Sequence, residues 1–553
     1  MNIPRFQATR TVKVMAAIAF ALGAASMAQA ASLDIDTATI ADLNKAYSSG
    51  HLTSEKVVAA YLKRIKAYDK QGPTINAVIT LNPKALATAK ALDKERKSGK
   101  VRGPLHGIPI VLKDNYDTVD LPTTGGSQLL EGSLPHDDAY LVKRLRDAGA
   151  IIIAKVNMSE WAGGAGVYGT TDPELARKGA VPNGFSSAGG QTRNPHDLAR
   201  GPAGSSGGTG AAIAATFAQF GMGTDTGGSI RGPSSVNGLV GLKPTNGLLS
   251  RNGIIPLSLT FDTGGPIARS VSDLAIALGT MTGVDPADPL TATSAGKFDT
   301  DYTKFLKPGA LKGARIGIAR DFMGRNAETD RIIEAAIVTL KQQGAVIVDP
   351  VHYPKYLLDV RQSLLNTIMN ADFKAQITDY LQKNTDAKYP RTYADIVARS
   401  NDPAVGYRSP EKAWGLKYNA TVSLDQTDPV YLAAKNDGLP LIKSTMLAVF
   451  ANDKLDAILY PTSPEPATLI NPPAEQRAAG GGSATLIANE TGFPDLIVPA
   501  GMTKDGLPVS ISLFGPAFSE GKLLGYGYDF EQATKAHVLP KHTPALLSDK
   551  LSY

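Results

Sequence analysis

The chain has 553 residues, of which 43% are hydrophobic and 20% charged, and this composition excludes disordered, collagen-like and coiled-coil proteins. Its formal net charge is +6, yet it contains no run of five Lys or Arg and only two Trp, which argues against a nucleic-acid-binding surface. Because it has no cysteine, disulfides, thiolate metal sites and a cysteine nucleophile are excluded as well.

The first 30 residues have the layout of a secretory signal peptide. Arg5, Arg10 and Lys13 precede an apolar stretch at 14–25, and residues 28–30 (Ala-Gln-Ala) supply a cleavage site. The apolar stretch is too short to span a membrane, which needs about twenty residues. We therefore expect cleavage near Ala30, export to the periplasm or the medium, and no stable membrane anchor. Removal of residues 1–30 lowers the net charge from +6 to +3.

Apolar residues at helical spacing predict that the first hundred residues are helical, and the pattern then changes. Short apolar runs at 108–112 and 151–154 indicate buried strands, separated by a helix that begins at Asp138 and ends at Gly149. The stretch 161–200, rich in Gly, Pro, Asn and Ser, predicts a long surface loop. Further strands are expected at 314–319, 345–348, 456–460, 496–498 and 509–513.

This alternation of helices and strands predicts an α/β fold with helices packed on a mostly parallel or mixed sheet. No low-complexity linker and no internal repeat interrupts the chain. We therefore expect one large domain at 31–553, in which residues of about 290–450 form a variable helical portion.

Two glycine- and serine-rich loops, at 201–208 and 223–231, flank a predicted helix at 211–219. A helix of about 10–12 residues rises roughly 15–18 Å, and a strand of about five residues returns a similar distance. Ser205 and Ser229 can therefore lie at the same edge of the sheet, with Ser205 at a helix N-terminus. The turn at 226–229 would present backbone N–H groups to an oxygen that gains negative charge. A loop that binds an anion such as phosphate would use the same geometry and stays open as an alternative.

Lys113 follows directly on the strand predicted at 108–112, so its amine is expected at the edge of the sheet. Burial can lower the pKa of a lysine by as much as ~3–5 units and so make the neutral amine available as a base. The alternative is a surface ion pair between Lys113 and Asp114 or Asp117.

Other short patterns carry less weight. The seven histidines show no spacing typical of a zinc site, and no metal is expected. Gly204-x-Ser206-x-Gly208 matches the nucleophile elbow of the α/β-hydrolases, but no strand is predicted directly before it.

Taken together, three ordered segments resemble the amidase signature family. They are 103–115, which runs from Gly-Pro-Leu-His-Gly-Ile-Pro to Lys-Asp-Asn, the loop 204–208, and the loop 223–231. The similarity continues through 262–273 and 505–509 and so covers nearly the whole mature chain. In that family a single domain folds around a twisted mixed sheet flanked by helices. The segments 138–150, 159–162 and 189–195 are most similar to those of bacterial peptide amidases.

The resemblance implies a role for each matching residue. Ser229 would be the nucleophile, Ser205 a bridging serine held by a cis peptide bond, and Lys113 the base. The oxyanion hole would consist of the backbone N–H groups of Thr226, Gly227, Gly228 and Ser229, while the loops would be held in place by Ser206, Asp225 and Arg231. Residues 162–188 and Gly232 would lie near the substrate pocket.

An exported serine amidohydrolase of this kind would cleave carboxamide C–N bonds through an acyl-enzyme, with water as co-substrate. It would release ammonia from peptide C-terminal amides or related small amides, and it would need no cofactor, metal or obligate protein partner. An esterase or aryl-acylamidase with the same triad is the alternative among hydrolases. A non-catalytic periplasmic solute-binding protein is the alternative from another class.

Overall fold

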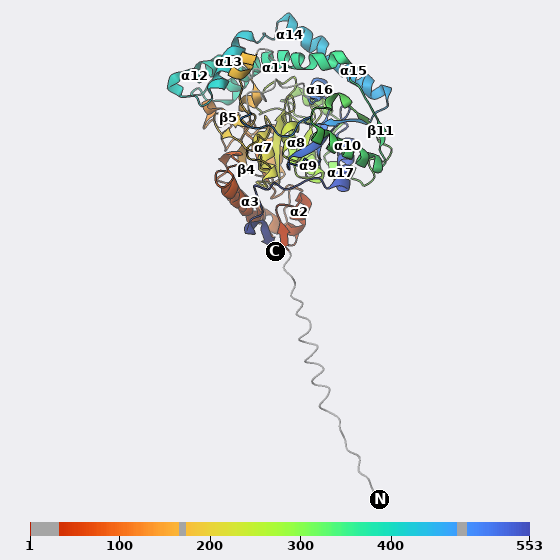
Figure 1. Ribbon diagram of the computed structural model, residues 1–553. Coiled ribbons are helices and arrows are strands. Elements are labelled where there is room, and N and C mark those ends of the chain that lie inside the picture. Colours follow the sequence, from red (N-terminus) through yellow and green to blue (C-terminus); the bar gives the residue numbers. More distant parts are fainter. Residues whose placement is uncertain (2–31, 165–172, 473–483) are drawn as a thin grey trace.

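The computed structural model describes all residues except 2–31, 165–172 and 473–483, so the predicted signal peptide lies outside the described residues. An 11-stranded mixed sheet forms the centre, and helices pack around it (Figure 1). In spatial order its strands are β11 (Val346–Val348), β10 (Arg315–Ile318), β12 (Ala457–Pro461), β14 (Pro508–Phe514), β13 (Asp495–Met502), β8 (Val240–Lys243), β9 (Thr263–Ala268), β7 (Phe220–Asp225), β3 (Pro109–Lys113), β4 (Ile151–Val156) and β2 (Val78–Leu81).

The pairing of β3 with its neighbours positions the candidate site. β3 is parallel to both β4 and β7, whereas β7 is antiparallel to β9. The predicted α/β fold with a mixed sheet is therefore confirmed. Because β3 and β7 run in the same direction with Leu112 opposite Met222, the chain leaves both strands at the same edge of the sheet. Lys113 and Thr224 are brought together there.

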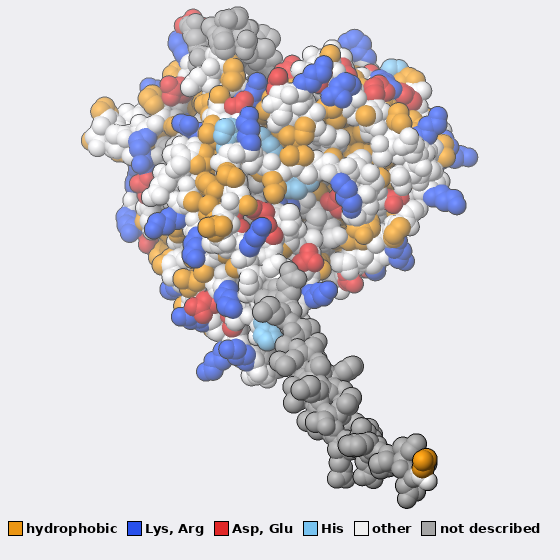
Figure 2. All heavy atoms as spheres, turned by 60° about the horizontal axis from the view of Figure 1, so that its bottom comes forward, with side chains coloured by type: hydrophobic (Ala, Val, Ile, Leu, Met, Phe, Trp, Pro, Cys, Tyr) orange, Lys and Arg blue, Asp and Glu red, His pale blue; other side chains and the backbone are white. Residues whose placement is uncertain are grey.

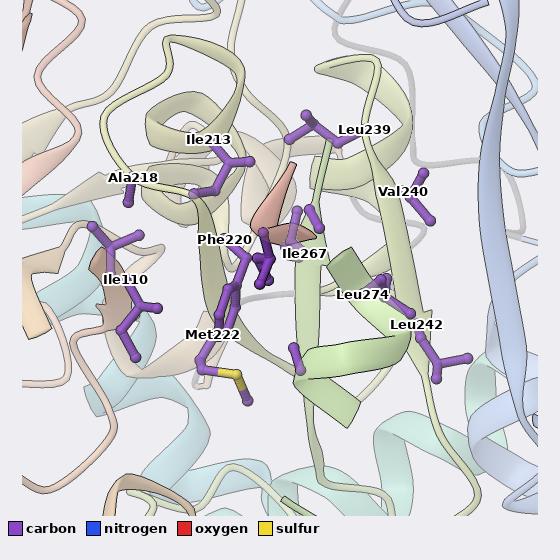
Figure 3. Packing of buried hydrophobic residues seen from close by; sticks show 14 of the residues in the cluster. Ile110, Ile213, Ala218, Phe220, Met222, Leu239, Val240, Leu242, Ile267 and Leu274 are labelled. Atoms are coloured by element: carbon purple, nitrogen blue, oxygen red, sulfur yellow. The ribbon is translucent and has the colours of Figure 1, made fainter. Parts of the chain in front are cut away.

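Apolar side chains fill both faces of the sheet around β7. Ile110 of β3, Phe220 and Met222 of β7, and Ile267 of β9 are all fully buried (Figure 3). Such side chains contribute about 1.5–3 kcal/mol each when removed from water. Strands covered on both faces tend to be continuously apolar, which is why the short hydrophobic run at 108–112 predicted β3 correctly.

Ten helices of the described residues pack around the sheet: α2 (Ile40–Ser48), α3 (Ser54–Tyr68), α4 (Ala85–Lys97), α5 (Tyr140–Asp147), α7 (Gly207–Ala214), α8 (Arg231–Val236), α9 (Val271–Met281), α10 (Ala327–Gln342), α16 (Leu486–Thr491) and α17 (Glu520–Thr534). The described residues up to 100 contain three helices, α2, α3 and α4, as the helical pattern predicted, but they also contain β2 and the short strand β1 (Ser32–Asp34). β1 pairs with β15 (Lys550–Ser552) next to the C-terminus. Both strands are short, and their pattern did not separate them from the neighbouring helices.

Residues 290–450 contribute to two parts of the molecule. β10 and β11 extend the central sheet, with α10 packed against it, and five further helices form a layer at the top of Figure 1. We call these five the helical layer: α11 (Lys355–Asn384), α12 (Tyr393–Ser400), α13 (Pro410–Val422), α14 (Pro429–Ala433) and α15 (Leu439–Asn452). Within the described residues, no helix is both long and apolar enough to cross a membrane.

Two predictions about the loops were wrong in detail. The helix between the glycine loops starts at Gly207 and ends at Ala214, because Thr216 adopts a positive φ of 56° that turns the chain into β7. The described part of 161–200 is not a simple surface loop. It contains α6 (Pro173–Lys178), β5 (Phe185–Ser186) and β6 (Gly190–Gln191), and Thr192 and Asn194 are fully buried because their side chains are hydrogen-bonded to backbone groups.

Charged side chains are mixed on the face of the molecule shown in Figure 2. There Lys and Arg lie singly among Asp, Glu and apolar side chains. Mixed charges of this kind are typical of an ordinary globular surface.

Candidate active site

Lys113, the last residue of β3, is completely buried. Its Nζ donates hydrogen bonds to Ser205 Oγ at 2.8 Å and to Thr224 Oγ1 at 2.7 Å. Burial lowers the pKa of Lys113 to about 7, although the carboxylates of Asp225 and Asp262 act in the opposite direction. A large fraction of such an amine is neutral near pH 7 and can accept a proton.

The alternative of a surface ion pair for Lys113 is wrong. Asp114 Oδ1 lies 3.3 Å from Nζ of Lys155, and Asp117 accepts a hydrogen bond of 2.5 Å from the Tyr380 hydroxyl. Within the described part of the chain, Lys113 forms no ion pair, and its two close partners are hydroxyl groups. A buried lysine without a paired carboxylate favours the neutral form.

Ser205 lies just before α7, and the Gly204–Ser205 peptide bond is cis. Its carbonyl accepts a hydrogen bond of 2.9 Å from Ser159 N. A Cβ on Gly204 would lie only 2.4 Å from Ser159 Oγ, so the close approach of these two loops requires glycine. With 3% of its surface exposed, Ser205 lies almost as deep as Lys113.

Ser206 joins the two glycine loops. Its hydroxyl donates to Thr224 O at 3.1 Å and lies 3.2 Å from Thr224 N, and its own backbone N–H donates to Ser229 O at 3.2 Å. These bonds hold Ser205 and Ser229 at the same edge of the sheet. Through them Ser206 connects the two loops.

Ser229 lies on the more exposed side of this group. Gly227, Gly228 and Ser229 are half-buried, in contrast to Lys113 and Ser205. Among the residues that the structure describes, no partner hydrogen-bonds to the Ser229 hydroxyl, which lies in the turn between β7 and α8. A hydroxyl in this position is accessible to a substrate from outside.

The four expected oxyanion-hole amides are not equivalent. The N–H of Gly228 donates to Asp225 Oδ1 at 2.8 Å, so it is not available to donate to a substrate oxygen. Within the described residues, the amides of Thr226, Gly227 and Ser229 have no hydrogen-bond partner. Three amides therefore remain of the four that we predicted, because the Asp225 carboxylate turns the fourth inward.

Asp225 and Arg231 form a fully buried ion pair beneath this turn, with Arg231 Nη2 2.9 Å from Asp225 Oδ1. Arg231 Nη1 also lies 2.9 Å from Asp495 Oδ2, and Asn489 Nδ2 donates to Asp225 Oδ1 at 2.9 Å. Burial alone would raise the pKa of Asp225, but the Arg231 guanidinium holds it well below its usual range. The pair stays charged and ties α8 to β7, α16 and β13.

Sequence reasoning missed several residues that the fold brings to this site. Thr224 contacts Lys113, Asp262 accepts a hydrogen bond from the Thr226 hydroxyl, and the Thr485 hydroxyl donates to Gly227 O at 3.1 Å. Thr224 and Asp262 stand inside two of the segments that carried the resemblance, so their position offered a signal. Thr485 stands outside those segments and comes close only through folding.

The region expected near the pocket is partly described. Residues 165–172 of the stretch 162–188 lie outside the described residues. Gly232 lies at the start of α8, where its N–H donates to Gly228 O at 2.8 Å and an added Cβ would lie 3.6 Å from Ala203 Cβ. Gly232 is therefore next to the loop that carries Ser205.

The arrangement distinguishes the two interpretations of the glycine loops, an anion-binding loop and a catalytic site. An anion-binding loop needs only the free amides of the turn. It has no use for a buried lysine hydrogen-bonded to a serine 92 residues away. A lysine, a bridging hydroxyl and an accessible serine beside free amides can instead support nucleophilic attack on a carbonyl group. Among the described residues no group of three or more His, Asp or Glu side chains could hold a metal ion.

Comparison with known proteins places the chain in a family. The Amidase family matches residues 56–524. The chain is 39% identical to the native peptide amidase from Stenotrophomonas maltophilia, with a TM-score of 0.82 over 92% of this chain and 99% of that one. It is 34% identical to a probable amidase of Arabidopsis thaliana over 95% of this chain and 96% of the relative. It is 30% identical to an amidase family protein from Bacillus anthracis, with a TM-score of 0.81 over 92% of this chain and 93% of that one.

Proposed function

The chain belongs to the amidase signature family and is a hydrolase of amide C–N bonds, and from this premise we propose how it acts and on what. We propose that Ser229 forms an acyl-enzyme with the substrate while Ser205 and Lys113 carry the proton. The observation that supports this most directly is the 2.8 Å contact between Lys113 Nζ and Ser205 Oγ in a fully buried position.

The proton path begins at the neutral amine of Lys113. Its two N–H groups have acceptors on Thr224, the hydroxyl at 2.7 Å and the carbonyl at 3.5 Å. In this neutral form the lone pair of the nitrogen faces Ser205 Oγ at 2.8 Å. The hydrogen bond that the protonated amine donates to Ser205 is then reversed, and Ser205 donates to the lysine. Ser205 passes its proton to Lys113 and takes the proton of Ser229, whose oxygen attacks the amide carbonyl.

The negative charge that forms on the carbonyl oxygen is held by backbone amides. The N–H groups of Thr226, Gly227 and Ser229 donate to it. When the C–N bond breaks, the proton returns through Ser205 to the departing nitrogen, and ammonia leaves. Water then attacks the acyl-enzyme, gives its proton to the same path, and the carboxylic acid is released as Ser229 regains its proton.

The substrate class that we propose is the C-terminal amide of peptides, or related small amides. The similarity to the peptide amidase of Stenotrophomonas maltophilia over nearly the full length of both chains supports this choice. Membership of an enzyme family removes the solute-binding protein from consideration. Export to the periplasm or the medium is also a proposal, and it rests on the basic, apolar and Ala-Gln-Ala segments of residues 1–30.

Release of ammonia by the mature protein tests this function. The substrate panel contains peptide amides, aliphatic amides, aryl amides and esters, and each is assayed with the wild type, Ser229→Ala and Lys113→Ala. Ammonia is measured for the primary amides, the released arylamine or alcohol for the aryl amides and esters, and the carboxylic acid for all of them. We expect ammonia from peptide amides, lost in both variants. Ser423→Ala, outside the site, serves as a control and should keep wild-type activity. Faster cleavage of aryl amides or esters than of any peptide amide would overturn the substrate class and favour an aryl-acylamidase or esterase.

A further inference from the structure

Asp262, just before β9, holds the turn that carries the free amides. We call residues 226–229 the oxyanion loop. Asp262 is 6% exposed, and its Oδ1 accepts a hydrogen bond from the Thr226 hydroxyl. Its Oδ2 accepts from the backbone N–H groups of Leu257 at 2.8 Å and Ser258 at 2.9 Å. A buried carboxylate that accepts three hydrogen bonds fixes the groups that donate them.

Ser258 continues this connection toward the helical layer. While its N–H donates to Asp262, its carbonyl accepts from Asp262 N at 2.7 Å. Its hydroxyl donates to Oδ2 of Asp372, in α11, at 2.6 Å. Ser258 is therefore bonded to two buried carboxylates at once, one next to the oxyanion loop and one in the helical layer.

Asp372 is completely buried and gathers three segments. Besides Ser258, the Thr260 hydroxyl donates to its Oδ2 at 2.6 Å. Its Oδ1 accepts from Gln426 Nε2 at 2.9 Å and from the Tyr431 hydroxyl of α14 at 2.7 Å. All four donors are neutral, so the position of Asp372 on α11 depends on hydrogen bonds from α14, from Gln426 and from the segment before β9.

The helical layer also touches the oxyanion loop directly. A Cβ on Gly227 would lie 3.4 Å from Leu486 Cδ2 of α16 and 3.7 Å from Leu365 Cδ1 of α11. Leu365 is two turns before Asp372 on the same helix. The loop is thus packed against α11 at one point and bonded to it, through Asp262 and Ser258, at another.

We propose that Asp262 and Asp372, together called the carboxylate bridge, are positioning residues that hold the oxyanion loop in register with the helical layer. This inference rests on the proposed function, because it concerns the amides that stabilise the oxyanion. Neither carboxylate touches the reacting atoms. The bridge acts through Thr226 and sets where the free amides of the loop point.

The bridge should affect the transition state more than substrate binding. Oxyanion donors are effective only within about 2.7–3.1 Å of the developing charge, and a displacement of about 1 Å can cost as much as a hundredfold in rate. Ground-state binding uses the rest of the substrate and is little changed. Loss of the bridge is therefore expected to lower kcat and leave KM nearly constant.

Asp262→Asn, Asp372→Asn, Thr226→Val and Thr226→Ser test the proposal in the full mature protein with a peptide amide. We expect kcat to fall about tenfold to a hundredfold in the first three, with KM within about threefold. Thr226→Ser keeps the hydroxyl and should restore most of kcat. Inhibition by a peptide aldehyde, whose adduct with Ser229 places an oxygen in the oxyanion position, should weaken by the same factor as kcat/KM.

A double variant distinguishes the bridge from two unrelated effects. Because Asp372 is proposed to act through Thr226, Thr226→Val combined with Asp372→Asn should be no slower than the slower single variant. Asp285→Asn is the matched control, since Asp285 is 5% exposed and accepts hydrogen bonds from Ser250 and Ala287 N. It is not part of the bridge and should keep wild-type kcat.

The outcomes separate the bridge from the proposed function. Wild-type kcat in folded Asp262→Asn and Thr226→Val, or a loss confined to KM, overturns the bridge while leaving the acyl-enzyme mechanism in place. Should Asp262→Asn fail to fold, Thr226→Val decides, since it leaves the other two donors to Asp262 intact. A wild-type protein that hydrolyses no amide overturns both proposals.

Discussion

Lys113 and Ser205 are joined by a hydrogen bond of 2.8 Å, and both residues are almost completely shielded from bulk water. Lys113 comes from the end of β3 and Ser205 from the loop before α7. They meet because β3 and β7 are parallel neighbours and α7 leads into β7. Since its partners are hydroxyls rather than carboxylates, the lysine is poised to exchange a proton near neutral pH.

The first prediction concerns pH. The pKa of Lys113 is about 7, and only the neutral amine can accept the proton of Ser205. Protonation at lower pH therefore removes the base, so kcat/KM should rise with pH, reach half of its maximum near pH 7 and level off about one pH unit above that. A pH–rate profile with a neutral peptide amide checks this. Burial raises the pKa of Asp262 to about 6, so this carboxyl titrates in a similar range. If Lys113 is the base, the rise of kcat/KM with pH should persist in Asp262→Asn. A flat profile between about pH 5 and 9 would contradict the role of Lys113.

The second prediction concerns the chemistry of the base. Lys113→Ala should lower kcat by about 10²–10⁴, the usual contribution of a positioned acid–base group. Lys113→Arg should not restore activity, because a guanidinium stays protonated at every pH of interest. Both variants are measured by single-turnover ammonia release. Activity of Lys113→Arg close to that of the wild type would show that charge, rather than proton transfer, matters at this position.

The third prediction concerns Gly228, which has a φ of +123° and stands in the oxyanion loop. A Cβ there would lie 2.6 Å from Thr485 Oγ1, so Gly228→Ala must displace the loop or α16. We expect kcat to fall about a hundredfold, as for a misplaced reacting group. Gly50→Ala is the control, because Gly50 also has a positive φ, +80°, but nothing lies within 4 Å of an added Cβ.

The two glycine variants are compared by kinetics and by thermal unfolding. Gly50→Ala should introduce only backbone strain, which lowers the free energy of unfolding by about 1–2 kcal/mol, and the variant should keep its activity. Equal losses of activity in both variants would mean that contact with Thr485 has no special importance.

The fourth prediction concerns the buried ion pair. Arg231→Met leaves Asp225 and Asp495 without their common cation, and removing one partner of such a pair costs about 3–5 kcal/mol. Arg320 provides a surface control. It also bonds to two carboxylates, Asp349 and Glu334, but its side chain is 29% exposed, so Arg320→Met should cost at most about 1 kcal/mol. Equilibrium denaturation with urea measures both. A similar loss in the two variants would argue against a special role for the buried pair.

Much of this protein can be determined from its sequence alone. Continuous apolar runs predicted β3 and β4 because strands buried on both faces have no polar side to show. The order and spacing of the motifs around Lys113, Ser205 and Ser229 indicated the family. Such motifs can be recognised in the sequence because each consists of a few neighbouring residues. Their backbone conformation is set locally, above all by glycine.

Only the tertiary structure decided which groups of the site are free and which are used. The sequence shows four amides in a row at 226–229, yet the fold turns the Gly228 N–H onto Asp225. It likewise shows Asp114 beside Lys113, yet the fold pairs Asp114 with Lys155 and leaves Lys113 with hydroxyls. Asp372 reaches the site through a hydrogen bond between residues 114 positions apart. Hydrogen bonds and burial depend on distances between remote segments, and those distances are set by how the whole sheet and its helices pack.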